Sequence, residues 1–152
     1  MITRADIVAE ARSWLGTRYR HQARVKGVAT DCIGLLGGVA LACDVPGARE
    51  WAADMSLHAY ARTPDPVLLR AGCERFLDRL PAVQSAREGD VLLFALDGEP
   101  RHFALVSEAG AGGPVRVIHA YALLAARRVV EQLLPIARAT LIGAYGFRGL
   151  AA

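Results

Sequence analysis

Apolar side chains recur at helical spacing in the first sixteen residues and fill the stretch that begins at residue 32. Thr3 fits an N-cap with Asp6 three residues later, and Gly16 is placed to end this first helix. The apolar face consists of Ile7, Val8, Ala11, Trp14 and Leu15. Residues 32–43, "CIGLLGGVALAC", are apolar on every side, which predicts a second, buried helix. Its glycines are expected to let this helix approach the sheet closely.

A third helix is predicted over residues 63–81, with Thr63 as N-cap, Pro64 at the first helical position and Pro81 closing it. Residues 44–61, "DVPGAREWAADMSLHAYA", show no clear periodicity and are expected to be irregular. The polar stretch 17–30 is expected to be a loop.

The pattern changes after residue 88 to short segments bounded by Gly, Pro and Asp, which is typical of strands. The five expected strands are "GDVLLFAL", "HFALVSEA", "VRVIHAY", "RRVVEQLL" and "LIGAYGFR". The "GAGG" of residues 110–113 fits a hairpin turn. Helices followed by a meander predict an α+β fold, with N-terminal helices packed on an antiparallel sheet of about five strands. We expect one domain over residues 1–152.

Composition narrows the classes of function. The 152 residues are 53% hydrophobic and 22% charged, as in globular domains, and the formal net charge is +3. The basic residues are scattered arginines, so we expect no nucleic-acid partner. The chain has neither a signal-peptide pattern nor an apolar run of about 18 residues, so we expect synthesis in the bacterial cytoplasm and no membrane insertion.

Cys32 is the first candidate for chemistry, because it stands where the second helix begins. Unpaired N–H groups and the helix dipole favour a thiolate there, and Asp31 fits the N-cap. A thiolate paired with an imidazolium is then the expected resting state. Since a free cysteine in a helix rich in Gly and Leu is often a small core residue, the position alone leaves both readings open.

Two histidines favour the catalytic reading. His102 begins one expected strand and His119 ends the next, so an antiparallel pairing places them side by side, one as base and one to orient it. Each alone fits a solvated strand end equally well. Tyr19 precedes Cys32 in the loop and is a candidate, with Asp31, for the oxyanion or substrate site.

The other histidines and cysteines receive simpler interpretations. His21 and His58 lie in expected loops, while Cys43 and Cys73 lie on helix faces and are expected in the core. Three cysteines without C-x-x-C make neither a disulfide framework nor a zinc site, and H-E-x-x-H is absent. We therefore expect no metal and no cofactor.

The segments "WLGTRYRHQARVKGVATDCIGL", "REGDVLLFA", "RHFALVSEAG" and "VIHAY" resemble, in this order, the NlpC-type cell-wall peptidases of the papain-like superfamily. The loop before "DCIGL" is most similar to the bacteriophage tail-associated subgroup. The resemblance implies that Cys32 is the nucleophile, His102 the general base and His119 the residue that orients it. It also places Tyr19 near the active centre and implies no cofactor.

The implied reaction is hydrolysis of an amide in the peptidoglycan stem peptide, typically between D-γ-glutamyl and diaminopimelate, through a thioester. The implied partners are peptidoglycan and the proteins of a phage or phage-like tail. The expected place of action is the periplasm or cell wall during cell entry. Two alternatives stay open: a structural tail-assembly module that keeps the fold with little activity, and acyl transfer or amide hydrolysis on another substrate.

Overall fold

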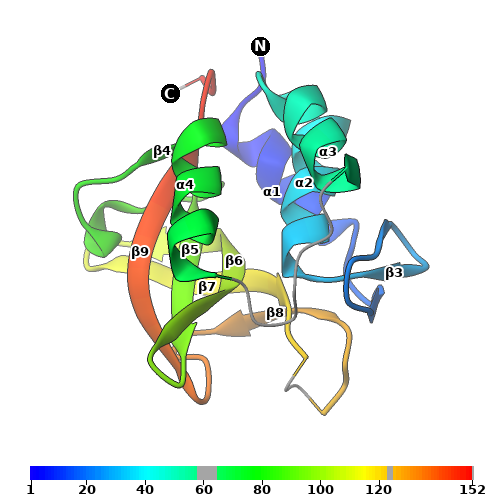
Figure 1. Ribbon diagram of the computed structural model, residues 1–152. Coiled ribbons are helices and arrows are strands. Elements are labelled where there is room, and N and C mark those ends of the chain that lie inside the picture. Colours follow the sequence, from blue (N-terminus) through cyan, green and yellow to red (C-terminus); the bar gives the residue numbers. More distant parts are fainter. Residues whose placement is uncertain (58–64, 123–124, 152) are drawn as a thin grey trace.

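The computed structural model describes residues 1–57, 65–122 and 125–151, which form four α-helices, one 3₁₀ turn, a six-stranded sheet and a small three-stranded sheet (Figure 1). The helices are α1 (Arg4–Arg12), α2 (Cys32–Ala42), α3 (Ala48–Leu57) and α4 (Pro66–Phe76), and the 3₁₀ turn is η1 (Val83–Ser85). The small sheet contains β1 (Arg18–Tyr19), β2 (Arg24–Val25) and β3 (Ala29–Thr30). The large sheet contains β4 (Leu77–Arg79), β5 (Val91–Leu96), β6 (Glu99–Gly110), β7 (Gly113–Ala120), β8 (Val129–Leu133) and β9 (Ala139–Phe147).

The large sheet is antiparallel, with strand order β4-β9-β5-β6-β7-β8. Strands β5 to β8 follow one another as hairpins, and β9 returns to pair with β5. All five predicted strands are present, and Gly110 pairs with Gly113 across the predicted hairpin turn. The sixth strand, β4, was not predicted, because it owes its conformation to pairing with β9 at the far end of the chain. The α+β prediction is confirmed.

Helices α1 and α2 begin where the sequence predicts. Thr3 and Asp6 form a capping box at the start of α1, and the Asp31 side chain caps α2. Helix α1 ends at Arg12, and Trp14 is buried in the turn that follows. The prediction for Leu15 is wrong, since its side chain is 43% exposed.

The prediction that residues 44–61 are irregular is wrong for the central part of this segment, which forms α3. Pro46 and Gly47 form the turn that precedes the helix, with Gly47 at φ +84°. After that turn the helix contains three Ala together with one Arg, one Glu and one Met, all of which are good helix formers. His58 lies outside the described residues.

The third predicted helix is shorter than expected. Asp65 caps α4 and Pro66 occupies its first turn, whereas Thr63 and Pro64 lie outside the described residues. The helix ends at Phe76 rather than at Pro81, because Leu77 is extended and pairs with Phe147. Tertiary pairing therefore overrides the local helical pattern.

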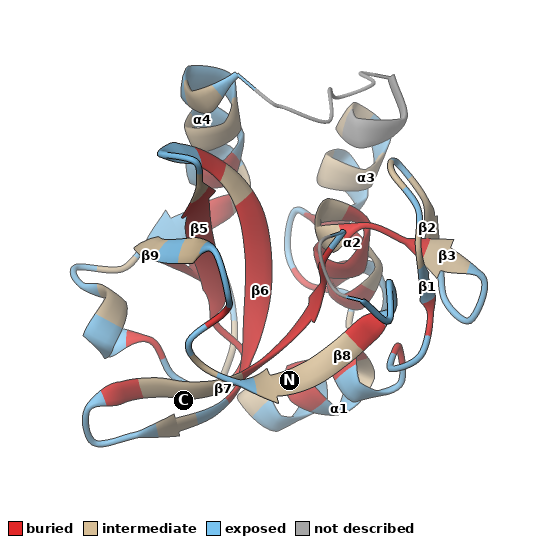
Figure 2. Ribbon diagram, turned by 90° about the horizontal axis from the view of Figure 1, so that it is seen from below, coloured by how far each residue is buried: buried red, intermediate tan, exposed pale blue. Residues whose placement is uncertain are grey.

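The large sheet buries both of its faces, and β5 to β7 are its most buried part (Figure 2). On one face, sheet residues such as Leu93, Phe103 and Leu105 pack in one cluster with residues of α1, α2 and α4. On the other face, Phe94 and Ala104 pack with residues from loops beside η1 and β9. Neighbouring residues of β6 thus face opposite clusters, as the period of two in a strand requires.

Two glycines of α2 are required by close approach, though not to the large sheet as expected. A Cβ at Gly34 would overlap the Ala23 carbonyl oxygen and lie 2.8 Å from Thr30 Oγ1. A Cβ at Gly38 would overlap the Trp14 ring. These glycines seat α2 against the loop before it and against the end of α1, which fixes where its first residue lies.

The Gly-Asp pair before β5 has a structural role. Asp90 Oδ1 accepts a hydrogen bond from Arg4 Nη1 at 2.7 Å, and Oδ2 accepts one from the Arg87 backbone N–H. The Asp90 side chain is 1% exposed and that of Arg4 is 21% exposed, so this partly buried ion pair joins the start of α1 to the start of β5. Gly89 has φ +84°, which only glycine adopts readily.

Candidate active site

Cys32 is the first residue of α2, at the end of the helix that carries unpaired N–H groups. Its side chain is half-buried, and the backbone N–H groups of Cys32, Ile33 and Phe103 lie near enough to its sulfur to lower the pKa of the thiol. Phe103 follows His102 in β6. The thiol therefore lies near the backbone of β6 at Phe103, the residue that follows His102 in the strand.

Asp31 holds the approach to this helix. Its Oδ1 accepts the Gly34 N–H at 2.7 Å, and its Oδ2 accepts the Gln22 N–H at 2.7 Å. The carboxylate is 3% exposed, and His21 Nδ1 lies 3.9 Å from its Oδ2. Both oxygens therefore fasten the loop to the helix start. A carboxylate also has no hydrogen to donate to an oxyanion, so the geometry favours the capping role over an oxyanion role.

His102 and His119 are brought together, as predicted. His102 Nε2 lies 2.7 Å from His119 Nδ1, and His119 Nε2 lies 2.7 Å from Gln132 Oε1 of β8. Because the amide oxygen accepts, His119 Nε2 carries a hydrogen and its Nδ1 accepts from His102 Nε2–H. This leaves the lone pair of a neutral His102 on Nδ1. We call the three side chains the imidazole relay.

Sequence reasoning missed one member of the relay, Gln132, and one neighbour of it, Tyr121. Gln132 was read only as part of a strand, although the pairing of β7 with β8 places it across from Val117, two residues before His119. Tyr121 lies with its ring 4.5 Å from the His102 ring and donates from its hydroxyl to the Ala137 carbonyl. Alternation along a strand is the signal that could have found Tyr121. Residues 119 and 121 are two positions apart, so their side chains lie on the same side of an extended chain.

Burial shifts the pKa of the thiol and of the base in opposite directions. It raises the pKa of Cys32 to about 12, with a further contribution from the Asp31 charge. It lowers the pKa of His102 well below its usual value, and His119 lowers it further. Burial also lowers the pKa of His119, against the hydrogen bond to Gln132. Both pKa shifts favour the neutral thiol and the neutral imidazole, the opposite direction from the expected thiolate–imidazolium pair.

Tyr19 lies in β1, next to Thr30 of β3, so it is one strand away from the residues that begin α2. Its backbone N–H donates to the Arg127 carbonyl at 2.8 Å. The side chain is half-buried against the helix-side cluster. Tyr19 thus lies on the strand beside the segment that leads to Cys32, and its place in the active centre and its part in the reaction stay predictions.

The remaining candidates lie elsewhere. Cys73 is buried in the core as predicted, while Cys43 is half-buried with its sulfur 3.8 Å from the Asp6 carbonyl oxygen. Among the described residues, no group of three His, Cys, Asp or Glu side chains is arranged to hold a metal ion. None of the described helices is both long enough and apolar enough to cross a membrane.

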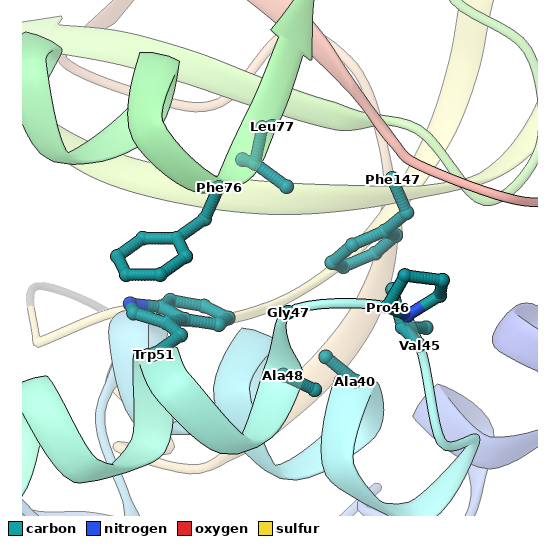
Figure 3. A pocket seen from close by; sticks show the side chains of 9 residues that line it. All are labelled: Ala40, Val45, Pro46, Gly47, Ala48, Trp51, Phe76, Leu77 and Phe147. Atoms are coloured by element: carbon teal, nitrogen blue, oxygen red, sulfur yellow. The ribbon is translucent and has the colours of Figure 1, made fainter.

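A separate apolar pocket lies toward the other end of α2, about 12 Å along the helix from Cys32 (Figure 3). Trp51 and Phe76 face each other across it, with ring centroids 6.3 Å apart. Its remaining lining residues are Ala40, Val45, Pro46, Gly47, Ala48, Leu77 and Phe147. Since this lining offers no base or nucleophile, the pocket is not the reaction site.

No protein-family model matches the sequence, and no curated protein matches it. Solved structures share its fold. The NlpC/p60 domain of the peptidoglycan hydrolase SagA matches with a TM-score of 0.64 and 22% identity, over 96% of this chain and 100% of that chain. NlpC1 from Trichomonas vaginalis matches with a TM-score of 0.64 and 15% identity, over 93% of this chain and 42% of that one.

An NlpC/p60 family protein from Bacillus cereus ATCC 10987 matches with a TM-score of 0.62 and 18% identity, over 95% of this chain and 40% of that one. The chain thus spans about two fifths of the length of the last two structures. The chain therefore has the fold of NlpC/p60 domains, with Cys32 at the start of its second helix and the imidazole relay on adjacent strands of its sheet.

Proposed function

We propose that the protein is a cysteine peptidase that hydrolyses an amide bond in peptidoglycan stem peptides. The observation that carries this proposal is the imidazole relay, whose members hold His102 Nδ1 as a proton acceptor at the strand against which the Cys32 thiol lies. Neutral histidines buried in a chain of short hydrogen bonds are costly to maintain and are typical of acid–base sites. The fold shared with NlpC/p60 domains supports the cell-wall substrate.

The first half of the reaction forms a thioester. His102 Nδ1 takes the thiol proton as Cys32 Sγ attacks the amide carbon, and His119 accepts the hydrogen bond of the resulting imidazolium. The backbone N–H groups of Cys32 and Ile33, which point toward the sulfur, are placed to stabilise the developing oxyanion. His102 then returns the proton to the leaving amine, and the C–N bond breaks.

The second half regenerates the enzyme. A water molecule loses a proton to His102 Nδ1 and attacks the thioester carbon, and the sulfur leaves as thiolate and recovers the proton from His102. The products are one free carboxylate and one free amine. No further reactant is consumed, so the residues of this chain supply every proton transfer.

The finer parts of the proposal rest on the sequence resemblance. Cleavage between D-γ-glutamyl and diaminopimelate follows from the NlpC-type motifs, and action from a phage or phage-like tail follows from the loop before Cys32. We include both in the proposed function, with peptidoglycan and tail proteins as partners and the periplasm or cell wall as the place of action.

Digestion of purified sacculi tests the reaction. The wild-type protein is expected to release soluble fragments, and mass spectrometry of these fragments identifies the bond cut. The Cys32→Ala protein, shown to be folded by circular dichroism, should release none. Equal release by both proteins would exclude Cys32 as nucleophile.

Particles assembled with the Cys32→Ala protein test the tail role and its structural alternative. A peptidase predicts normal particles that fail to breach the wall of their host. A structural module predicts that particles carrying Cys32→Ala enter cells as the wild type does.

A further inference from the structure

Several arginines of the described chain have a carboxylate partner. The pairs include Arg12 with Glu131, Arg49 with Asp44, Arg75 with Asp54, Arg116 with Glu108 and Arg148 with Asp78. Four exposed arginines beside the candidate active site have no such partner among the described residues, and the Arg128 guanidinium instead donates from Nη1 to the Gly16 carbonyl at 3.0 Å. Within residues 1–57, 65–122 and 125–151, no carboxylate lies in ion-pairing distance of Arg18, Arg20, Arg127 or Arg128. We call these four side chains the arginine rim.

The fold, rather than the sequence, gathers the rim. Arg18 and Arg20 flank Tyr19 and lie two positions apart, at and just after β1, while the Tyr19 side chain packs inward. The Tyr19 N–H donates to the Arg127 carbonyl, and Arg18 forms an antiparallel bridge with Arg128. More than a hundred residues apart in sequence, the two pairs therefore meet side by side.

The rim also borders the site on two sides. The Arg20 N–H donates to the Thr30 carbonyl at 3.0 Å, and Thr30 leads through Asp31 to the nucleophile. Arg128 directly precedes β8, the strand that carries Gln132 of the imidazole relay. Figure 2 shows β1 and the start of β8 on the same side of the molecule. The rim thus lies on the segments that lead directly to Cys32 and to the strand of Gln132.

Four guanidinium groups without carboxylates repel one another and create a local positive potential. The guanidinium group binds carboxylates through paired N–H donors, and each exposed contact contributes modestly. We propose that the arginine rim binds carboxylate groups of the peptide substrate next to the amide that is cut, and so selects acidic peptides. This inference rests on the proposed function for the identity of the reacting amide, but the binding itself does not require catalysis.

Binding to the folded Cys32→Ala protein tests the rim without turnover. The probes are two labelled hexapeptides, Ala-Glu-Ala-Glu-Ala-Glu and the same peptide with Gln in place of Glu, measured by fluorescence anisotropy in low salt. The acidic peptide should bind more tightly, and the preference should shrink as salt rises, since charges are screened within about 10 Å at 0.1 M. In the Arg18→Gln/Arg20→Gln background, affinity for the acidic peptide should fall about fivefold.

The matched control is Arg49→Gln/Arg79→Gln, which removes two exposed positive charges that have carboxylate partners elsewhere on the surface. It should leave the preference unchanged. Equal binding of both peptides, or equal losses in both double variants, would overturn the proposal. A third probe, linear polyphosphate of matched charge, distinguishes the ligand class: tighter binding of polyphosphate than of the acidic peptide would also overturn it.

The two proposals fail separately. If the acidic peptide binds through the rim while the wild type releases nothing from sacculi, the proposed function is wrong and the rim stands. If sacculi are digested and the rim variant shows an unchanged KM for acidic fragments, the rim is wrong and the peptidase stands.

Discussion

Cys32 and Cys73 lie in two regions that bury a thiol in the same way but surround it with different groups. Both thiols lie where helices meet the same face of the sheet, and burial raises the pKa of each to about 12. Cys32, however, begins α2 beside backbone N–H groups and the strand of His102. Cys73 lies within α4 among core side chains, with the Tyr145 hydroxyl near it.

This comparison shows that the pKa of the free thiol does not identify the nucleophile. A thiol with a high pKa reacts only if a base takes its proton during attack, so the neighbours decide. The Cys32 region supplies a proton acceptor held by two further side chains, and the Cys73 region supplies packing. The same substitution in the two regions should therefore affect different properties.

The largest expected difference is in activity. Cys32→Ala should lower kcat on sacculi at least about a thousandfold, because the thioester can no longer form. Cys73→Ala should keep kcat within about threefold and instead destabilise the protein by about 1 to 2 kcal/mol, because it removes a buried sulfur. Fragment release and urea unfolding measure the two effects. A large loss of kcat in a folded Cys73→Ala protein would contradict the comparison.

Glycines next to the two cysteines give the second contrast. Gly34→Ala should destabilise the protein by about 2 to 3 kcal/mol, because the new Cβ overlaps the Ala23 carbonyl and crowds Thr30. Gly72→Ala in α4 meets no atom within 4 Å and should stabilise by up to about 1 kcal/mol through helix propensity. Urea unfolding measures the change in the free energy of unfolding for both variants. Equal changes would mean that α2 does not pack against the Ala23 carbonyl and Thr30 as described.

A smaller effect is expected from the end of the imidazole relay. Gln132→Leu should lower kcat about tenfold, because His119 loses the acceptor that fixes its tautomer. Gln132→Glu keeps an acceptor and should recover most of the activity. Gln84→Leu, on the exposed η1 turn, is the control. Equal rates for the Leu and Glu variants at position 132 would show that the hydrogen bond plays no part.

The smallest effect is a displacement of the pH profile. His102 acts as a base only when neutral, and its pKa is lowered, so the rate should fall with acid only below about pH 6.5. The pKa of Cys32 is raised to about 12, so no alkaline decline is expected up to about pH 9. If kcat/KM already fell with acid at a midpoint above pH 7, or if it declined between pH 7 and 9, the reacting pair would instead be a thiolate and an imidazolium.

The sequence predicts those features that depend on neighbouring residues. The cap at Thr3, the start of α2 at Cys32 and the strands around His102 and His119 follow from local patterns, and the two histidines meet because adjacent strands form a hairpin. Features that depend on distant pairing were missed. Strand β4 exists because β9 pairs with it, and Gln132 reaches His119 only through the register of β7 with β8.

The resting charge of the site was also beyond the sequence. A helix start favours a thiolate, and this effect is visible in the N–H groups that lower the pKa of Cys32. Burial against β6 raises the pKa of Cys32 by more than these N–H groups lower it. Burial of His102 likewise favours the neutral form, and so lowers the pKa of the base. Only the packing of α2 on the sheet determines how large these burial effects are.

A double-mutant cycle tests the central claim, that Cys32 and the imidazole relay act as one unit. The kcat for fragment release is measured in the wild type, Cys32→Ala, His102→Ala and the double variant, with folding checked for each. Residues that act together show no further loss when both are removed, so both Cys32→Ala and the double variant should sit at the same residual rate, with His102→Ala close to it. Additive losses, or a folded His102→Ala protein within tenfold of the wild type, would contradict the account.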